Sequence, residues 1–270
     1  MKITLSNKQK VSQFSSILKN LKNFSNDIEI HISPSKMFAQ VMDNSHACLF
    51  ELHLDAEWFE TYEVEQEVVL GINCELLSRV LNCLDANQKI EIKYEEDSDN
   101  LFITLFPNEG ESGIIKEFKM PLIDIETDIL DVPDAEFTAD IEMLSQEFSE
   151  LVSQLSIFGQ DLQIRCKDDI RVTGKGELGS MDAIIKEDDI IMFAIEEDKE
   201  LSLLYAMSYV LLITSFSKVN KKVQIHISEE IPMKIQYSMD SFMDENDDND
   251  EESEGDKNFI RFFLAPKIED

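Results

Sequence analysis

The sequence predicts an α+β protein in which a few helices pack on one side of antiparallel sheets. Short alternating runs rich in Ile, Val and Phe far outnumber the helical patterns. Hairpin-length turns, rather than helical crossovers, join these runs. One helix followed by several strands recurs along the chain, and the order repeats after Pro133. With 270 residues, 43% of them hydrophobic, the chain is long enough for two domains with substantial cores.

The first half contains two helical patterns and a series of strand patterns. Val11, Phe14, Leu18 and Leu21 recur at helical spacing, which predicts an amphipathic helix over 11–21. A second apolar face, with Arg79 and Asn82 pointing away from it, predicts a helix over 74–84. Strands are predicted at 28–32, 36–42, 47–54, 67–72, 89–96, 101–106 and 114–120.

The second half repeats this order after an irregular connection. Residues 121–136 lack a steady period and carry several acids, which is typical of an extended interdomain linker. Helices are predicted over 141–155, with Leu144 on the apolar face, and over the apolar run 201–216. Strands are predicted at 136–140, 162–167, 169–174, 181–186, 190–195, 222–227, 233–237 and 259–264.

The charge is strongly negative. The formal net charge is −32, and nine acids lie between Asp244 and Asp256, so the rest of the chain still carries −23. Such a charge predicts solubility and repulsion from nucleic acids and anionic membranes. The acidic run lacks the glycine and glutamate spacing of an EF-hand loop. It is predicted to be a solvated loop at the tip of the last hairpin.

No motif in the sequence supports catalysis or a bound cofactor or metal. The GxGxxG match at 174–179 is followed by another strand pattern, so a β-turn is predicted there instead of a dinucleotide site. The four histidines stand alone, and no nucleophile, base and oxyanion donor come together. The four cysteines lie in apolar runs without CxxC spacing, which predicts buried free thiols in a reducing compartment. With no signal-peptide or membrane-spanning pattern, we expect a soluble intracellular protein that is not an enzyme.

Three stretches, MDNSHACLF (42–50), GELGS (176–180) and LAPKIED (264–270), resemble the eukaryotic sliding clamp family, proliferating cell nuclear antigen. The similarity continues in order through the whole chain. It implies a DNA-clamp fold, in which two similar domains form antiparallel sheets, helices line the inner face, and three subunits close a ring. The implied division is an N-terminal domain over 1–122, a connecting linker over 123–136 and a C-terminal domain over 137–270, whose acidic hairpin loop covers 243–257.

The resemblance implies a DNA polymerase processivity factor. Such a clamp encircles double-stranded DNA without sequence specificity and docks replication and repair proteins that carry a clamp-binding peptide motif. A clamp-loader ATPase is a further implied partner, no cofactor is implied, and the expected location is the nucleus, or a viral replication site if the chain is a divergent, virus-encoded member. The alternative is a clamp-like scaffold that docks peptides without encircling DNA.

The resemblance also implies three groups of site residues. The docking pocket would comprise Met42, His46, Ala47, Leu49, Leu130, Val132, Pro133, Phe137, Pro232, Phe263, Leu264, Ala265, Pro266 and Ile268. The DNA-facing residues would be Lys8, Lys10, Lys19, Lys22, Arg79, Lys218, Lys221 and Lys222. The subunit contact would pair 114–120 with 171–180 and include Lys116, Phe118, Gly176 and Leu178.

The predicted DNA-facing surface departs from the family pattern. Positions that are usually basic in the family hold Asn82, Glu150, Ser153, Ile157, Ser208 and Ser215. Positive charge is therefore concentrated in the first domain. From this we expect a weak, strongly salt-dependent grip on DNA, with retention coming mainly from closure of the ring.

Overall fold

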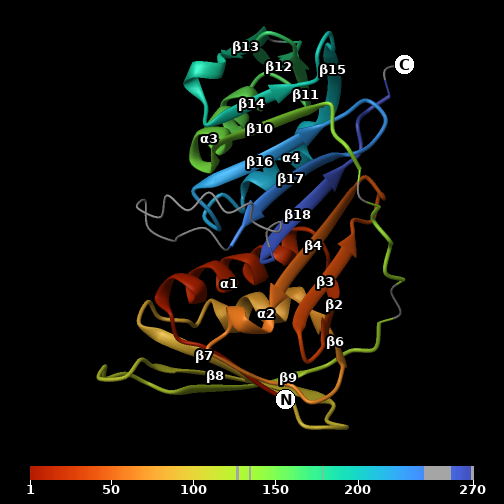
Figure 1. Ribbon diagram of the computed structural model, residues 1–270. Helices are drawn as coiled ribbons and strands as arrows, with labels where there is room; N and C mark the ends of the chain where they lie inside the picture. The colour runs from red at the N-terminus through yellow and green to blue at the C-terminus, as the bar shows by residue number, and fades with distance from the viewer. Residues whose placement is uncertain (126–127, 134, 178, 240–256, 269–270) are drawn as a thin grey trace. The chain divides into compact units, whose positions relative to one another are not determined.

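The computed structural model describes residues 1–125, 128–133, 135–177, 179–239 and 257–268 (Figure 1). The chain divides into two compact units that are not contiguous in sequence. Unit 1 comprises Met1–Val41, Glu51–Ile129 and Met239–Phe259. Unit 2 comprises Met42–Phe50, Leu130–Ser238 and Ile260–Asp270. Each unit therefore includes a short segment that is far in sequence from the other residues of that unit.

Unit 1 contains antiparallel strands in the orders β5-β1-β7-β8-β9 and β4-β3-β2-β6. Along β2 and β8, exposure alternates residue by residue, as expected for strands with one face on a core. The strands are β1 (Lys2–Leu5), β2 (Asp27–Ile32), β3 (Lys36–Met42), β4 (Cys48–Asp55), β5 (Thr61–Glu63), β6 (Val68–Asn73), β7 (Gln88–Lys93), β8 (Asn100–Pro107) and β9 (Lys116–Pro121). The last residue of β3 and the first three residues of β4 belong to unit 2.

Two capped helices, α1 (Lys8–Asn20) and α2 (Cys74–Leu81), pack against each other in unit 1 and lie on β7 and β9. The side chain of Asn7 accepts hydrogen bonds from the amides of Gln9 and Lys10 at 3.0 and 3.2 Å. Asn73 caps α2 in the same way, through the amide of Leu76 at 2.9 Å. These asparagines satisfy amides that have no partner within the helix, and so they set where each helix begins.

Unit 2 repeats this plan with strands in the orders β14-β10-β16-β17-β18 and β13-β12-β11-β15. Helix α3 (Ser145–Leu155) packs against α4 (Met207–Thr214), and neither has a side-chain cap. The strands are β10 (Ala139–Leu144), β11 (Asp161–Cys166), β12 (Ile170–Gly176), β13 (Gly179–Ile185), β14 (Met192–Ile195), β15 (Leu201–Ala206), β16 (Lys222–Ile227), β17 (Met233–Ser238) and β18 (Phe259–Leu264).

Aromatic side chains fill both cores. In unit 1, the Phe14 ring lies 6.2 Å from that of Trp58 and 6.1 Å from that of Phe59. In unit 2, the Phe262 ring lies 5.3 Å from that of Phe50 and 5.0 Å from that of Phe216. The α+β class and the antiparallel sheets predicted from the sequence are confirmed.

The third and fourth helices begin several residues later than the sequence predicted. Residues 201–206 form β15, which pairs with β11 from Leu201↔Cys166 to Ala206↔Asp161, so the fourth helix begins only at Met207. Similarly, 141–144 belong to β10, and Leu144 ends that strand at 42% exposure instead of lying on the apolar face of α3. Both runs are apolar at nearly every position, and only strand pairing distinguishes the two conformations.

One expectation about the cysteines also needs correction. Cys48, Cys74 and Cys166 are buried free thiols, as predicted, but Cys83 is exposed just beyond the end of α2. The short strands β1 and β5 were not predicted. Around the GxGxxG match, β12 ends at Gly176 and β13 begins at Gly179, so strands lie on both sides and no dinucleotide-binding helix follows.

Candidate functional site

Unit 2 contains an apolar pocket of about 420 Å³. Its walls come from four parts of the chain: the turn after β3, the segment that precedes β10, the start of β17 and the end of β18. A concave apolar surface with a few polar groups is typical of a peptide or small-molecule site. The lining residues are Met42, His46, Ala47, Leu49, Leu130, Asp131, Val132, Pro133, Ala135, Phe137, Ile231, Pro232, Lys234, Arg261, Phe263 and Ala265.

Asp43 holds the turn that carries His46 and Ala47. One of its oxygens accepts hydrogen bonds from the amides of Ala47 and Cys48, both at 2.7 Å. The other accepts from the Ser45 amide at 2.8 Å and from the hydroxyls of Ser45 and Tyr209. Burial alone would raise the pKa of Asp43, but these hydrogen bonds lower it to about 2. The ionised carboxylate therefore organises this wall of the pocket.

His46 takes a backbone conformation that few residues adopt. Its φ is 57°, in the left-handed region, and its amide donates to the carbonyl of Asp43 at 3.0 Å. Histidine is one of the residue types enriched in that region. The tight turn places His46 and Ala47 at the pocket wall.

The segment after β18 is fastened to the same turn. The amide of Ala265 donates to the carbonyl of Ala47 at 2.9 Å, and the amide of Lys267 donates to the carbonyl of Leu204 at 2.7 Å. The ammonium of Lys267 also lies 2.5 Å from Asp161. These contacts hold Phe263 and Ala265 at the pocket wall.

Two cations lie over the aromatic rings of the pocket. The Lys234 ammonium lies 5.0 Å from the centre of the Phe137 ring, and the Arg261 guanidinium lies 5.2 Å from that of Phe263. The imidazole of His226 packs 5.3 Å from Phe137 and contacts Asp140 through Nδ1. Burial lowers the pKa of His226 despite the opposing hydrogen bond to Asp140. Positive side chains thus stand beside both aromatic walls.

Most of the predicted docking residues meet in this pocket. The exceptions are Leu264, which is buried in the core at 1% exposure, Pro266, which does not line the pocket, and Ile268, which is 91% exposed. Sequence reasoning missed Asp131, Ala135, Ile231, Lys234 and Arg261. Arg261 could have been found, because it stands two positions before Phe263 in an alternating strand and so shares its face.

The predicted DNA-facing residues of unit 1 lie on or beside α1 and α2, mostly in local contacts. Lys8 contacts Glu111 at 3.4 Å, and Lys10 donates to the carbonyl of Trp58 at 2.6 Å. Partial burial lowers the pKa of Lys19. These contacts hold several of the expected phosphate-binding cations against the protein.

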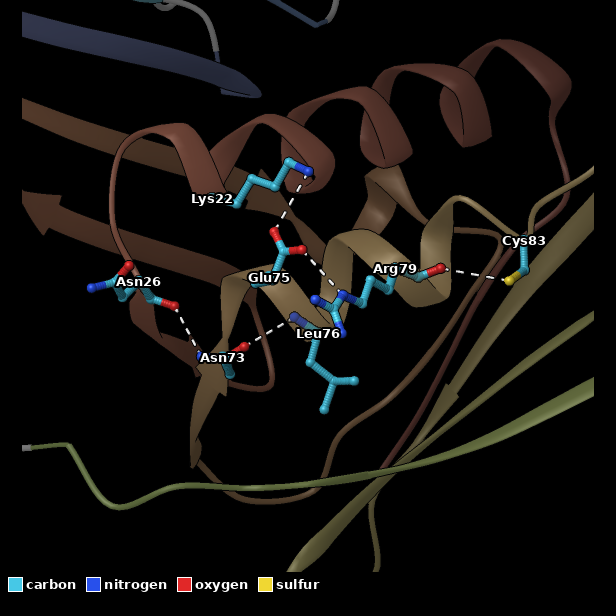
Figure 2. Close-up of polar contacts among 7 residues, drawn as sticks. All are labelled: Lys22, Asn26, Asn73, Glu75, Leu76, Arg79 and Cys83. Atoms are coloured by element: carbon cyan, nitrogen blue, oxygen red, sulfur yellow. Dashed lines mark hydrogen bonds and ion pairs between the residues drawn. The ribbon is translucent and has the colours of Figure 1, made fainter.

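Glu75 stands between the two remaining cations of this group, as Figure 2 shows. It lies 3.5 Å from the Lys22 ammonium and 3.1 Å from Arg79 Nε. The hydrogen bond from Arg79, followed by the charge of Lys22, lowers the pKa of Glu75. One carboxylate therefore offsets part of the positive charge on this helix pair.

In unit 2, the lysines that were predicted to face DNA come after the end of α4 in the sequence and are not part of the helix. Lys218, Lys221 and Lys222 are exposed, and Lys222 contacts Glu142 at 3.0 Å. The side chains that replace basic residues of the family pattern are exposed as well: Glu150, Ser153, Ile157, Ser208, Ser215 and, in unit 1, Asn82. The exposed surface of α3 and α4 therefore carries no Lys or Arg.

The strands expected at a subunit contact include two sheet edges. Strand β9, with Lys116 and Phe118, is the edge of the five-stranded sheet of unit 1. The expected partner, 171–180, is mostly β12, which is paired on both sides; the free edge is β13. Gly176 lies at the end of β12 next to that edge, whereas Leu178 lies outside the described residues.

Among the residues that the structure describes, no group of His, Cys, Asp or Glu could hold a metal ion. The helices of the same part of the chain are all too short or too polar to span a membrane.

Two family models match the chain. Residues 6–129 match the N-terminal domain of proliferating cell nuclear antigen, and residues 131–246 match its C-terminal domain. Together these matches cover well over half of the sequence, in the order that the resemblance predicted. The chain therefore belongs to the proliferating cell nuclear antigen family of sliding clamps.

Proposed function

We propose that this protein is a DNA polymerase processivity factor that closes into a homotrimeric ring around duplex DNA. Replication and repair proteins dock at the unit 2 pocket through a short peptide with an apolar plug, and a clamp-loader ATPase places the ring on DNA. The role is topological instead of catalytic, and its site is the nucleus or a viral replication site. The observation that carries the proposal is the convergence of residues from four parts of the chain on one apolar pocket.

The chemistry of the pocket suits an extended peptide. Apolar walls from Met42, Leu49, Val132 and Phe263 favour burial of aliphatic or aromatic side chains. Burying one such side chain contributes about 1.5 to 3 kcal/mol before the entropic cost of ordering the peptide. A motif with two or three apolar side chains is therefore enough for a reversible docking event.

Exposed apolar residues near two sheet edges support ring closure. Ile114 and Ile115, just before β9, are 73% and 61% exposed, and Ile184 on β13 is 52% exposed. An unpaired strand edge with apolar side chains is prone to pair with another chain. If β9 of each subunit pairs with β13 of the next, and the rotation between neighbouring subunits leads back to the first one, the subunits form a closed ring.

The charge distribution suggests a loose hold on DNA. The helix pair of unit 1 carries cations, whereas α3 and α4 expose Glu147 and Glu150. Acids farther than about 8 Å from a phosphate are largely screened at physiological salt, so the helix faces dominate any contact with DNA. We therefore expect weak, salt-sensitive binding to open duplex and persistent retention on circular DNA.

A second candidate function is a clamp-like scaffold that docks peptides without encircling DNA. The absence of Lys and Arg from the described helices α3 and α4 favours it. Native mass measurement with and without a polymerase-tail peptide, followed by retention assays on circular and linearised DNA, distinguishes the two. A trimer retained only on circles supports the clamp. A monomer that binds the peptide supports the scaffold, and tight, salt-insensitive binding to linear duplex contradicts retention by closure.

A further inference from the structure

The sheets formed by the described residues end in six edge strands, β5, β6, β9, β13, β14 and β15. The segment after β9 bonds to β6, because the Ile123 amide donates to the Gly71 carbonyl at 3.0 Å. The segment after β18 bonds to β15 in the same way, from the Lys267 amide to the Leu204 carbonyl at 2.7 Å. Strands β9 and β13 form the proposed subunit contact, and β5 has only three residues. Strand β14 is the remaining edge of this part of the chain.

The outer side of β14 offers backbone groups to a further strand. Among the described strands, β14 pairs with β10 alone. The Glu196 amide, just beyond β14, donates to the Thr138 carbonyl at 2.9 Å and so points toward β10. Because backbone groups alternate in direction along an antiparallel strand, those of Phe193 and Ile195 point away from β10. An edge of this kind can pair with one more extended segment.

The exposed side chains of this edge are apolar. Ile191 and Met192 are 43% and 41% exposed, and Ala194 is exposed as well. Met192 and Ala194 share one face of β14, since alternate side chains of a strand point to the same side. Residues 190–195 include no charged side chain that would discourage pairing with another chain.

A group of three acids flanks the strand on each side. These six exposed residues are Glu187, Asp188 and Asp189 before β14 and Glu196, Glu197 and Asp198 after it. Within the described ranges, none of their carboxylates forms an ion pair or a side-chain hydrogen bond. A cationic partner could therefore reach either group without displacing a contact that the fold already makes.

Nearby lysines do not offset these acids. Residues 186–200 contain seven acids and two lysines, Lys186 and Lys199, a net charge of −5. Lys167 contacts Glu200 at 3.1 Å, and counting it still leaves −4. The surface around β14 therefore attracts cations at both ends of the strand.

The neighbouring strand does not reverse this balance. On β10, Glu142 contacts the Lys222 ammonium at 3.0 Å, and Asp140 contacts Nδ1 of His226. Each carboxylate is matched by one basic side chain, so β10 adds no excess of positive charge. None of the residues 186–200 lines the docking pocket, so this edge is separate from the peptide site proposed above.

We infer that β14 binds an extended protein segment that carries Lys or Arg on both sides of a short apolar stretch. The segment adds a strand to the sheet through the backbone groups of Phe193 and Ile195, and its cations meet the two acidic groups. A second copy of this chain is disfavoured at this edge, because its own β14 brings the same acids. Nucleic acid is repelled here for the same electrostatic reason.

The test uses the full-length protein and a fluorescent peptide in which alternating Val and Thr residues separate two pairs of lysines. Anisotropy should show saturable binding at about 50 mM salt and at least about threefold weaker binding at about 200 mM, because screening weakens exposed ion pairs. The same peptide with Glu in place of Lys should not bind. Equal affinity of the Lys and Glu peptides would overturn the proposed charge of the partner.

Backbone methylation separates strand addition from charge attraction alone. N-methyl groups on the alternate amides that face β14 should weaken binding about tenfold or more, because they remove hydrogen bonds. The same groups on the other alternate amides should have little effect. Hydrogen exchange over 190–195 should slow when the unmodified peptide binds. Equal affinities of the two methylated peptides would overturn strand addition.

Neutralising one acidic group assigns the binding to this edge. The triple variant Glu196→Gln/Glu197→Gln/Asp198→Asn should bind the Lys peptide about three- to tenfold more weakly, since each exposed ion pair contributes little by itself. Asp198 has a left-handed φ of 61°, which Asn also adopts, so the turn after β14 should keep its backbone. Unchanged affinity in this variant would overturn the role of the acids.

The matched control is the triple variant Glu95→Gln/Glu96→Gln/Asp97→Asn in the β7–β8 connection of unit 1. It removes the same charge, and Asp97 has a φ of 60°, close to that of Asp198. The control should keep the native affinity for the Lys peptide. Equal losses in the two triple variants would reduce the effect to the overall charge of the protein and overturn the assignment to β14.

Competition distinguishes this edge from the docking pocket. An excess of unlabelled polymerase-tail peptide should leave the Lys peptide bound. Displacement would place the Lys peptide in the pocket and overturn the assignment to β14. Absence of any binding by the Lys peptide would overturn the inference, while the proposed clamp function would be unaffected.

Discussion

The phenol hydroxyl of Tyr209 donates a hydrogen bond of 2.5 Å to the carboxylate of Asp43. Tyr209 belongs to α4, and Asp43 begins the turn that carries His46 and Ala47 to the docking pocket. One hydrogen bond therefore links a helix expected to face DNA with the wall of the candidate peptide site. Because Asp43 accepts from four other donors as well, the turn is positioned by a single carboxylate.

Tyr209→Phe removes only this hydroxyl. We expect the affinity for a clamp-binding peptide to fall about three- to tenfold, because a hydrogen bond to a charged acceptor contributes roughly 1.5 kcal/mol and the turn becomes less ordered. Fluorescence anisotropy with a labelled peptide measures the change. Tyr62→Phe is the control, since Tyr62 donates to the Ser33 carbonyl at 2.9 Å in unit 1 and is not among the residues that line the pocket. Equal losses in the two variants would contradict a positioning role for Tyr209.

Asp43→Asn tests the contribution of the carboxylate to stability. The pKa of Asp43 in the folded state, about 2, lies below its ordinary value of 3.8. Its ionised form therefore stabilises the fold above about pH 4, and this contribution is lost as the pH falls toward 2. The variant should melt at a lower temperature than the native chain at pH 7, and the difference should shrink at low pH. A constant difference in melting temperature from pH 7 to pH 3 would argue against this linkage.

Glu75→Gln tests the electrostatics of the unit 1 helix pair. Removing this carboxylate releases Lys22 and Arg79 from their 3.5 and 3.1 Å contacts. Affinity for linear duplex should rise, and the slope of log K against log salt should steepen by about one to two, since each phosphate contact contributes roughly 0.9. Glu229→Gln, at an exposed position outside the helices, is the matched control. An unchanged salt slope would indicate that α1 and α2 do not contact DNA.

Ile184→Glu tests the subunit contact. This residue is 52% exposed on the edge strand β13, where a buried charge in an interface would cost several kcal/mol. Native mass measurement at low micromolar concentration should therefore show a monomer in place of a trimer. Ile157→Glu is the control, because Ile157 is also exposed but follows a helix instead of lying on a sheet edge. A trimer that tolerates Ile184→Glu would exclude this edge from the contact.

Local pattern was sufficient to predict much of this protein. The α+β class, most strand positions and the first two helices follow from side-chain periodicity, which reflects burial on one face of each element. Most apolar residues of the pocket were predicted through the resemblance of the whole chain to the clamp family, although Ala135 and Ile231 were missed. These features are local in the chain, and a single sequence reports them well.

Tertiary structure decided what depends on pairing between distant segments. Residues 201–206 are a strand because they pair with β11, although their composition alone fits a helix equally well. Likewise, the order of the strands leaves β13 at a sheet edge. Two contacts also join residues far apart in the sequence: Tyr209 with Asp43, and Lys234 with Phe137. Periodicity records which face of an element is buried, but not which partner buries it, and so these relationships emerged only from the folded chain.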